Sequence, residues 1–254
     1  MNPEPTRTED GAAGLPVSVR DLHKTFRDQE VLHGINVDIQ AGELFVIMGP
    51  SGSGKSVFLR QLIGLEQPSS GQVLVEGQPV SDEARERFRI AMVFQSGGLL
   101  NSLTVAENVG LFLSEHRLRK PGEIARIVEE KLQLVQLPAG TADKYPPELS
   151  GGMRKRVAIA RALTMEPQLI LFDEPTAELD PLVAVAIGRE ILRLNRQTHA
   201  TTVVVTHDRD LAFGIAHRIA FLAEGRIQAL GTPAEIRANP LPLLQQFLAA
   251  DFTP

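Results

Sequence analysis

The chain has 254 residues, of which 43% are hydrophobic and 22% are charged, with a formal net charge of −5 and no cysteine. This length can bury a substantial core, either as one α/β domain with a subdomain or as two small lobes. The acidic balance argues against a nucleic-acid partner, although a local basic patch is compatible with it, and the lack of cysteine excludes disulfides and thiolate metal sites.

The first residues carry no signal for export or membrane insertion. Residues 3–10 contain proline and acidic side chains where a signal peptide needs basic and then apolar ones. We therefore expect residues 1–15 to form a disordered tail. The sequence has no run of about 18 apolar residues, the length that a membrane span needs. We expect any membrane-embedded part to come from another chain.

The N-terminal third alternates short strands with turns. Apolar residues alternate with polar ones in the first two stretches, whereas the stretch after Gly42 is a continuous apolar run, typical of a central parallel strand. A helix is expected over residues 57–63, ending at Gly64. The predicted strands cover residues 17–26, 31–39, 44–48, 73–75 and a stretch around Val80.

A phosphate-binding motif follows the continuous apolar strand. Residues 49–56 match the pattern G-x-x-x-x-G-K-[ST] in full, and a strand precedes and a helix follows them, as this motif requires. Its glycines let backbone N–H groups converge on phosphates at the positive end of the helix. We expect Lys55 to reach the β- and γ-phosphates and the Ser56 hydroxyl to bind Mg²⁺. A chance match has odds of roughly one in a hundred at average residue frequencies.

The middle of the chain, residues 97–165, is rich in helix signals. Apolar residues recur at helical spacing over 123–137, and Pro138 and Gly140 stop the pattern. Leu149-Ser150-Gly151-Gly152-Met153 then precedes a run of good helix formers. A hydroxyl and bare N–H groups at a helix N-terminus can bind a γ-phosphate. An ordinary glycine turn before a helix would explain the two glycines alone, but not all five residues.

Polar residues end three further apolar strands. Asp173 and Glu174 follow residues 169–172, at the sheet edge where α/β proteins bind ligands. We expect Asp173 to hold Mg²⁺, directly or through water, and Glu174 to deprotonate the attacking water. His207 and Gln95 also follow strands. A structural histidine and a solvated amide are the alternatives for these two residues.

Two later helices are also predicted. Val183, Ile187, Ile191 and Leu194 form a stripe at helical spacing. Thr232, with proline next and glutamate three residues on, predicts a capping box that opens a helix.

The chain resembles the ATP-binding subunit of an ABC transporter over residues 17–236. Three motifs in this order carry the resemblance: the phosphate loop, the Leu149–Met153 segment and the Asp173-Glu174 pair. The resemblance implies an α/β fold with a P-loop NTPase (RecA-like) core, an antiparallel β subdomain, and a helical subdomain (about 97–165) inserted between Gln95 and Asp173. It implies an ATPase domain over 16–236, a C-terminal helical extension over 237–254, and ATP and Mg²⁺ as cofactors.

The resemblance also implies roles for individual residues. Glu174 and His207 are the expected catalytic residues, with His207 contacting the γ-phosphate. Gln95 is expected on Mg²⁺ beside Ser56 and Asp173. Phe26 stacks on adenine or, alternatively, belongs to the core. The expected ATP-binding residues are Phe26, Gly49, Pro50, Ser51, Gly52, Ser53, Gly54, Lys55, Ser56, Val57, Gln95, Ser150, Gly151, Gly152 and Met153.

Partners follow from the same resemblance. The chain's own phosphate loop is complete, so Ser150–Met153 is expected to serve the ATP of a second copy in a head-to-tail dimer. Residues 96–105 are expected to line a groove for a membrane permease, which places the chain peripherally on the cytoplasmic face of the inner membrane. Met153 departs from the usual glutamine, and residues 177–180 read Ala-Glu-Leu-Asp where Ser-Ala-Leu-Asp is commoner, so the hydroxyl thought to couple the two sites is missing.

Three segments look like the Mla/Mce-type ATPases: Met153-Arg154-Lys155-Arg156, residues 95–105, and Gln245-Gln246-Phe247-Leu248. This resemblance implies phospholipid or lipid trafficking, with a lipid-binding substrate protein and a small regulatory subunit. A solvated helix face is the alternative for the basic run at 154–156. An importer ATPase for amino acids or other small solutes is the alternative function. An ATPase acting on DNA or ribosomes is disfavoured, because no sustained heptads occur between Gln95 and Leu149 and the chain holds one cassette.

Overall fold

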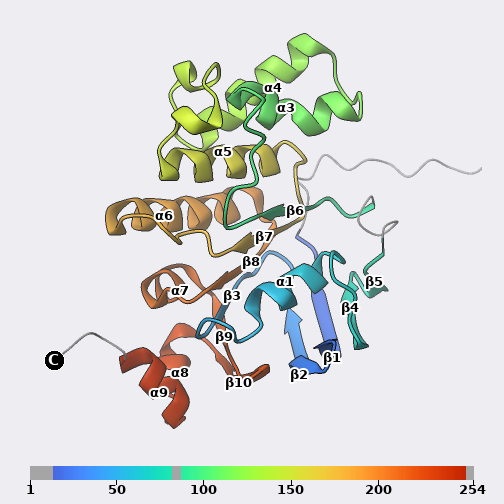
Figure 1. The fold of residues 1–254 in the computed structure, drawn as a ribbon, viewed down its shortest axis with the longest axis vertical. Coiled ribbons are helices and arrows are strands. Elements are labelled where there is room, and N and C mark those ends of the chain that lie inside the picture. The colour runs from blue at the N-terminus through green and yellow to red at the C-terminus, as the bar shows by residue number, and fades with distance from the viewer. Residues whose placement is uncertain (1–13, 82–86, 250–254) are drawn as a thin grey trace, which may run out of the picture.

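The computed structural model describes residues 14–81 and 87–249, which form two sheets surrounded by helices (Figure 1). Leu15, which we placed in the N-terminal tail, is buried, and its carbonyl accepts a hydrogen bond from Thr201 Oγ1 at 2.7 Å. The described residues therefore include Gly14 and Leu15, the last two residues of the predicted tail. Residues 1–13 of that tail, and residues 250–254 of the predicted C-terminal extension, lie outside the described residues.

The larger sheet has the strand order β10-β9-β3-β8-β7-β6. All neighbouring pairs are parallel except β9 and β10. Every residue of β3, β7 and β8 is buried, as expected for parallel strands covered on both faces. Its strands are β3 (Leu44–Met48), β6 (Ile90–Val93), β7 (Leu169–Asp173), β8 (Thr201–Thr206), β9 (Arg218–Ala223) and β10 (Arg226–Gly231). The carboxyl ends of β3, β6, β7 and β8 consequently meet at one edge.

The smaller sheet is antiparallel, with the order β2-β1-β4-β5. One buried cluster joins it to α1 (Lys55–Leu62) and to one face of the larger sheet, through residues such as Phe45 and Phe58. The strand expected around Val80 ends at Pro79, although Val80 N still donates to Val73 O at 3.1 Å. The strands are β1 (Val17–Phe26), β2 (Gln29–Ile39), β4 (Ser70–Val75) and β5 (Gln78–Pro79).

A helical segment between β6 and β7 lies at the top of the molecule in Figure 1. We call it the helical subdomain. It contains α3 (Val105–Glu115), α4 (Pro121–Leu134), short 3₁₀ turns at Ala139–Thr141 and Pro146–Glu148, and α5 (Gly151–Leu163). α4 begins two residues before the predicted helix, because Pro121 takes the first helical position, where its missing N–H costs nothing.

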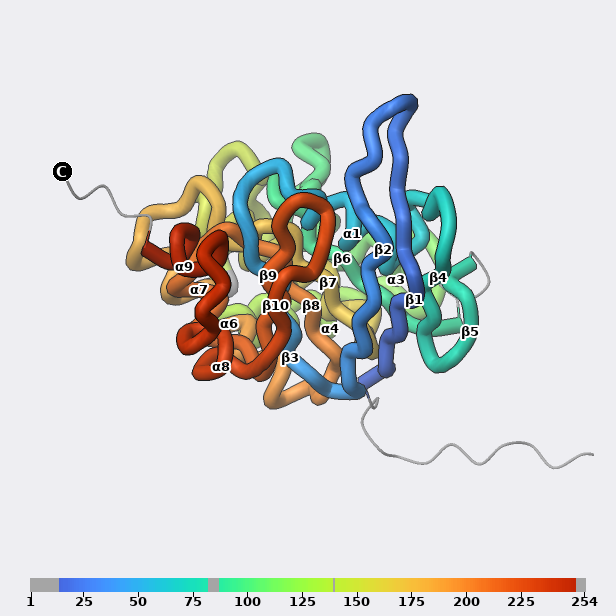
Figure 2. Tube along the Cα trace, turned by 90° about the horizontal axis from the view of Figure 1, so that it is seen from below, coloured from blue at the N-terminus to red at the C-terminus, as the bar shows by residue number. Residues whose placement is uncertain are grey.

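The remaining helices flank the larger sheet and complete the C-terminal part: α6 (Pro181–Thr198), α7 (Arg209–Ile215), α8 (Pro233–Ala238) and α9 (Pro242–Ala249). The capping box predicted at Thr232 is confirmed, since Glu235 N donates to Thr232 Oγ1 and Thr232 N to Glu235 Oε2. Figure 2 shows α8 and α9 on the opposite side of the molecule from β4 and β5. Among the described residues, no helix is long and apolar enough to cross a membrane.

Candidate active site

The phosphate loop, residues 49–56, joins β3 to α1. It needs glycine where the backbone has a positive φ and where a neighbouring strand leaves no room for a Cβ. Gly52 and Gly54 have φ values of 79° and 99°, a region that residues with a Cβ rarely adopt. A Cβ on Gly49 would lie 2.0 Å from Leu222 O, which excludes any side chain there. Ser53 Oγ is buried without a hydrogen-bond partner in the protein. A loop of backbone N–H groups with an unpaired buried hydroxyl fits phosphate oxygens.

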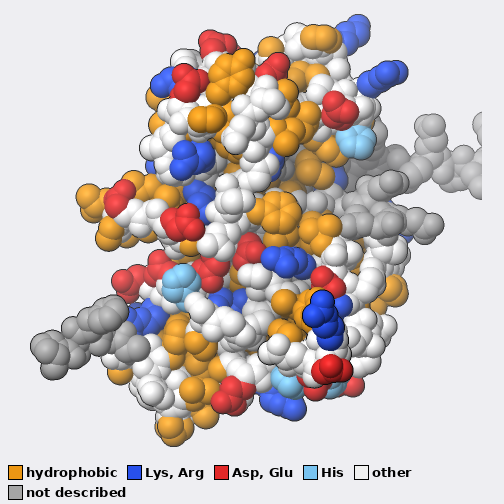
Figure 3. All heavy atoms as spheres, viewed as in Figure 1, with side chains coloured by type: hydrophobic (Ala, Val, Ile, Leu, Met, Phe, Trp, Pro, Cys, Tyr) orange, Lys and Arg blue, Asp and Glu red, His pale blue; other side chains and the backbone are white. Residues whose placement is uncertain are grey.

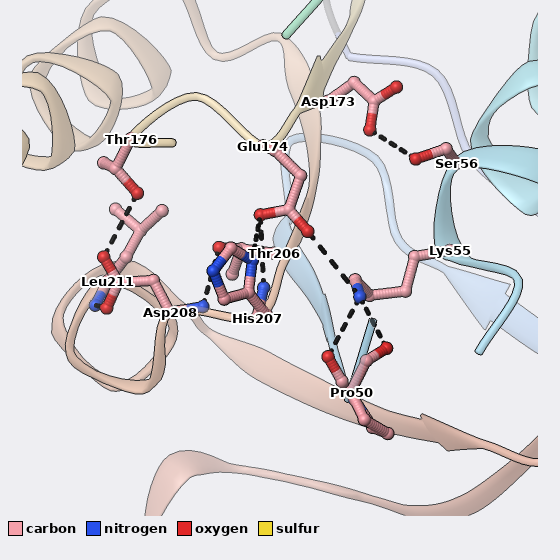
Figure 4. Close-up of polar contacts among 11 residues, drawn as sticks. Pro50, Lys55, Ser56, Asp173, Glu174, Thr176, Thr206, His207, Asp208 and Leu211 are labelled. Atoms are coloured by element: carbon pink, nitrogen blue, oxygen red, sulfur yellow. Dashed lines mark hydrogen bonds and ion pairs between the residues drawn. The ribbon is translucent and has the colours of Figure 1, made fainter. Parts of the chain in front are cut away.

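Lys55 carries a buried positive charge at this loop. Its Nζ donates to Gly49 O and Pro50 O, both at 2.9 Å, and lies 3.6 Å from Glu174 Oε1 (Figure 4). Burial lowers the pKa of Lys55, while the Glu174 and Asp173 carboxylates oppose that shift. A bound phosphate would favour the charged form further, so the position fits the role expected from the sequence.

Two oxygen groups suited to a magnesium ion lie side by side. Ser56 Oγ, in the first turn of α1, donates to Asp173 Oδ1 at 2.8 Å (Figure 4). Hydroxyl and carboxylate oxygens are ligands that Mg²⁺ prefers. The described residues contain no cluster of three or more histidine and acidic side chains arranged for a metal. Mg²⁺ held here would take further ligands from phosphates and water, and Gln95 stays the third protein group expected beside it.

Glu174 and His207, which follow neighbouring strands, are brought together. Glu174 Oε2 accepts a hydrogen bond from His207 N at 3.2 Å and lies 2.9 Å from His207 Nδ1 (Figure 4). Glu174 is buried, and its φ of 46° is unusual for a residue with a side chain. The arrangement fits a carboxylate base whose orientation is set by a histidine.

Two residues that the sequence reasoning missed hold this pair in place. Thr176 Oγ1 donates to Asp208 Oδ2 at 3.1 Å, and Asp208 Oδ1 accepts from Leu211 N at the start of α7 (Figure 4). This links the segment after Glu174 to the segment after His207. Asp208 could have been found from the sequence, since aspartate is a preferred N-cap residue. Thr176 carries no local signal for this contact.

Gln95 lies at the same edge, after β6. Its side chain is exposed, and its backbone carbonyl accepts a hydrogen bond from Lys155 Nζ. Gln95 and His207 both line a cleft of about 570 Å³, together with the segment 176–179. Figure 3 shows charged and histidine side chains gathered across the middle of this face, below the helical subdomain. The strand-end residues predicted from the sequence thus share one edge of the sheet.

The Leu149–Met153 segment forms the N-terminus of α5. Ser150 caps the helix, with its Oγ accepting from Met153 N at 3.3 Å. A Cβ on Gly152 would lie 2.4 Å from Val183 Cγ1, and one on Gly151 would lie 3.1 Å from Leu179 Cδ2. The glycines therefore serve the packing of α5 on α6 as well as leaving N–H groups bare.

The two helix ends that could bind phosphates belong to opposite faces of the larger sheet. α1 packs in the cluster that contains Phe45 and Ile47, whereas α5 packs in the cluster that contains Val46 and Met48. Successive strand residues point to opposite faces. The N-terminus of α5 is therefore separate from the chain's own phosphate loop.

Two alternatives from the sequence are corrected. Phe26 is 41% exposed, so it is not a core residue, and Lys24 Nζ lies 4.7 Å from the centroid of its ring. Stacking of Phe26 on adenine stays a prediction. The basic run at 154–156 is not simply a solvated face, because Lys155 is only 7% exposed.

The comparisons with known proteins agree with this geometry. A family model described as ABC transporter matches residues 32–177. The sulfate/thiosulfate import ATP-binding protein CysA of Caulobacter vibrioides is 42% identical over 89% of this chain and 67% of its own length. The probable ribonucleotide transport ATP-binding protein mkl of Mycobacterium leprae is 39% identical over 92% and 69%, and the sn-glycerol-3-phosphate import ATP-binding protein UgpC of Bordetella avium is 42% identical over 88% and 62%.

Solved structures give the same match. A dimeric, post-hydrolysis state of the ATP-binding cassette MJ0796 bound to ADP and Pi is 34% identical, with a TM-score of 0.78, over 85% of this chain and 98% of that one. The structure of cbiO1 from Clostridium perfringens, part of the ABC transporter complex cbiONQ, is 30% identical over 95% and 96%, also with a TM-score of 0.78.

Proposed function

This chain belongs to the ABC transporter family and is an ATP-hydrolysing subunit of such a transporter, and we propose that the transporter imports a small solute. Two of its relatives support import, because one is an import ATP-binding protein for sulfate or thiosulfate and another is an import ATP-binding protein for sn-glycerol 3-phosphate. The resemblance of three short segments favours lipid trafficking. The names of the relatives support the importer alternative instead.

The observation that carries the mechanism is the position of Glu174 between His207 and Lys55. The Ser56–Asp173 pair lies at the same edge of the sheet. Glu174 would accept the proton of the attacking water, and His207 would keep the carboxylate aligned. Lys55 would neutralise charge on the transferred phosphoryl group. Mg²⁺, when bound, would neutralise charge on the β- and γ-phosphates, with Ser56, Asp173 and Gln95 beside it.

We also propose that two copies complete each other's sites. The phosphate loop of one copy would face Ser150–Gly152 of the other, head to tail. The placement of α1 and α5 on opposite faces of the sheet supports this arrangement, since one chain does not bring its two phosphate-binding helix ends together. The dimeric, 34% identical MJ0796 cassette supports it independently.

The proposed docking site for the permease is an apolar groove between α3 and α4. The groove has a volume of about 670 Å³. The resemblance places the groove at residues 96–105, but this segment contributes only Leu103 to the lining. We propose that a short helix of the permease lies in this groove, which places the chain at the cytoplasmic face of the inner membrane. The apolar lining includes Leu103, Ala106, Leu111, Ile124, Val128 and Leu132.

Lipid trafficking of the Mla/Mce type, with a lipid-binding substrate protein and a small regulatory subunit, is the second candidate. It rests on the resemblance of three short segments, and the C-terminal one of these is a packed helix. Phe247 packs on Phe221 with ring centroids 5.4 Å apart, and Gln245 Nε2 donates to Asn239 O at 2.7 Å. The segment that resembles the Mla/Mce ATPases is thus part of the fold, as α9. An ATPase acting on DNA would need a long coiled coil inserted between its nucleotide motifs. The longest helix among the described residues, α6, has 18 residues, so this alternative is not supported.

One experiment separates the two candidates. The chain is tagged and purified from solubilised inner membranes, and its partner chains and bound lipids are identified by mass spectrometry. The complex is then reconstituted in liposomes with labelled sulfate and labelled sn-glycerol 3-phosphate. ATP-dependent uptake of either solute supports the proposal. Co-purified phospholipid with no uptake supports lipid trafficking, and the absence of any membrane partner contradicts both.

A further inference from the structure

The turn after β6 lies directly on α5. Two basic side chains of α5 donate hydrogen bonds to three backbone carbonyls of this turn. Lys155 Nζ donates to Gln95 O, Arg161 Nη1 donates to Gly98 O at 2.7 Å, and Arg161 Nη2 donates to Gly97 O at 3.0 Å. The turn also closes on itself, with Gly97 N donating to Phe94 O at 2.8 Å. Three contacts therefore tie residues 95–98 to one helix.

The backbone of the turn is shaped for this contact. Gly97 and Gly98 have φ values of 77° and 58°, which turn both carbonyls within reach of Arg161. A Cβ on Gly97 would lie 3.6 Å from Ala158 Cβ, so the turn approaches the surface of α5 closely. Side chains at both glycines would be strained, and the two carbonyls would lose their positions over the helix.

Lys155 is buried and Arg161 is half-buried. Lys155 is 7% exposed, and burial lowers the pKa values of both Lys155 and Arg161. The charges of Glu178, Asp173 and Glu174 oppose the shift at Lys155. Burying a charge is costly unless hydrogen bonds compensate it, and here the compensating acceptors are the carbonyls of one turn. Removing Lys155 would take away the contact at Gln95 O, and removing Arg161 would take away the contacts at Gly97 O and Gly98 O, so either loss would weaken the attachment of the turn.

We propose that Lys155 and Arg161 are positioning residues for ATP hydrolysis, which fix the Gln95–Gly98 turn to the helix whose N-terminus carries Ser150–Gly152. The turn places Gln95 at the hydrolytic edge of its own chain, and the start of α5 serves the nucleotide of the second copy under the function proposed above. The two parts move as one body. A displacement of α5 therefore moves both the Gln95–Gly98 turn and the phosphate-binding end of the helix.

The first test uses purified protein without a permease, so it does not depend on the docking or cargo proposals. Lys155→Met replaces the ammonium with an apolar group of similar length. We expect kcat for ATP hydrolysis to fall about tenfold to a hundredfold, as the loss of a charged hydrogen bond predicts, with KM for ATP changed less than about threefold. Lys155→Arg, which keeps a cationic donor, should recover kcat to within about threefold of the native value.

A matched control separates positioning from a general effect on α5. Arg156 is the next residue on the helix, and its Nη1 lies 3.5 Å from Gln136 O, away from the turn. Arg156→Gln should leave kcat and KM within about twofold of native. Arg161→Lys, which loses the two-pronged contact, should lower kcat with little change in KM. Native kcat in Lys155→Met, or a fall in Arg156→Gln as large as that in Lys155→Met, overturns the proposal.

A distance measurement tests the attachment of the turn to the helical subdomain that contains α5, and it remains informative if a variant is inactive. The native chain has no cysteine, so spin labels introduced through Ser96→Cys and Tyr145→Cys, both at exposed positions, are unique. We expect a narrow distance distribution in the native background and a broad one with Lys155→Met. Unchanged width in a variant with a native melting temperature overturns the proposal.

Discussion

His207 Nδ1 lies 2.9 Å from Glu174 Oε2, although the two residues follow different strands, β8 and β7. The His207 backbone N–H donates to the same carboxylate oxygen at 3.2 Å. The other oxygen, Oε1, lies 3.6 Å from Lys55 Nζ. The Glu174 carboxylate is therefore held at both oxygens by residues that follow two other strands of the sheet.

Replacing His207 tests whether this contact serves hydrolysis. We expect His207→Ala to lower kcat by up to about a hundredfold, because the Glu174 carboxylate loses its alignment and with it much of its contribution as a general base. Affinity for ATP should change little. His199, exposed at the end of α6, gives a matched control whose alanine variant should keep native activity. Equal steady-state rates in the two variants would contradict the assignment.

Replacing Lys55 should act on binding. Lys55→Ala removes the buried ammonium at the phosphate loop, and a hydrogen bond to a charged group contributes about 1.5–3 kcal/mol. We expect ATP to bind at least about tenfold more weakly, measured with a fluorescent ATP analogue, and hydrolysis to be lost. The control is Lys144→Ala, which removes an ammonium group at an exposed position and should leave the affinity for ATP unchanged. Unchanged affinity in Lys55→Ala would exclude its contact with the phosphates.

The pair formed by Ser56 and Asp173 predicts the metal dependence. Chelation of divalent ions should abolish hydrolysis, and added Mg²⁺ should restore it. Ser56→Ala removes one oxygen ligand, so the Mg²⁺ concentration for half-maximal activity should rise about tenfold, which corresponds to about 1.4 kcal/mol of binding free energy. Ser114→Ala, whose hydroxyl donates to Leu111 O within α3, should keep the native Mg²⁺ dependence. Identical titrations for both variants would rule out Ser56 as a ligand.

Gly152 predicts a change in stability, separate from its proposed place at the nucleotide of the second copy. A Cβ there would lie 2.4 Å from Val183 Cγ1, so Gly152→Ala should lower the free energy of unfolding by about 1–3 kcal/mol through overpacking. Adding Val183→Ala should recover part of this loss. Gly122, on α4, has open space where a Cβ would lie, so Gly122→Ala should not destabilise the protein. Urea unfolding measures all three, and equal stability of the two single variants would contradict the packing account.

The strand-end residues were predictable because their signals are local. A buried strand fixes where its carboxyl end lies, so Asp173, His207 and Gln95 could be placed at one edge from the apolar runs before them. The phosphate loop and the capping box at Thr232 are likewise defined by short spacings.

Contacts between distant segments were not predictable in this way. The burial of Lys155 under the Gln95–Gly98 turn depends on how α5 packs against the sheet, and three adjacent basic residues gave no indication which one would be buried. The approach of Gly152 to Val183 depends on the crossing of α5 and α6. The hydrogen bond between His207 and Glu174 required both strand ends and the following turns to be in register.

The most direct test of the account is the ATPase rate of Glu174→Gln, measured together with ATP affinity and mass in solution. The amide keeps the size of the carboxylate but cannot accept a proton, so kcat should fall about a hundredfold to ten-thousandfold while ATP still binds. Sedimentation with ATP should show a dimer, held by nucleotide that is not hydrolysed. A Glu174→Gln variant that hydrolyses ATP at the native rate would contradict the proposed mechanism.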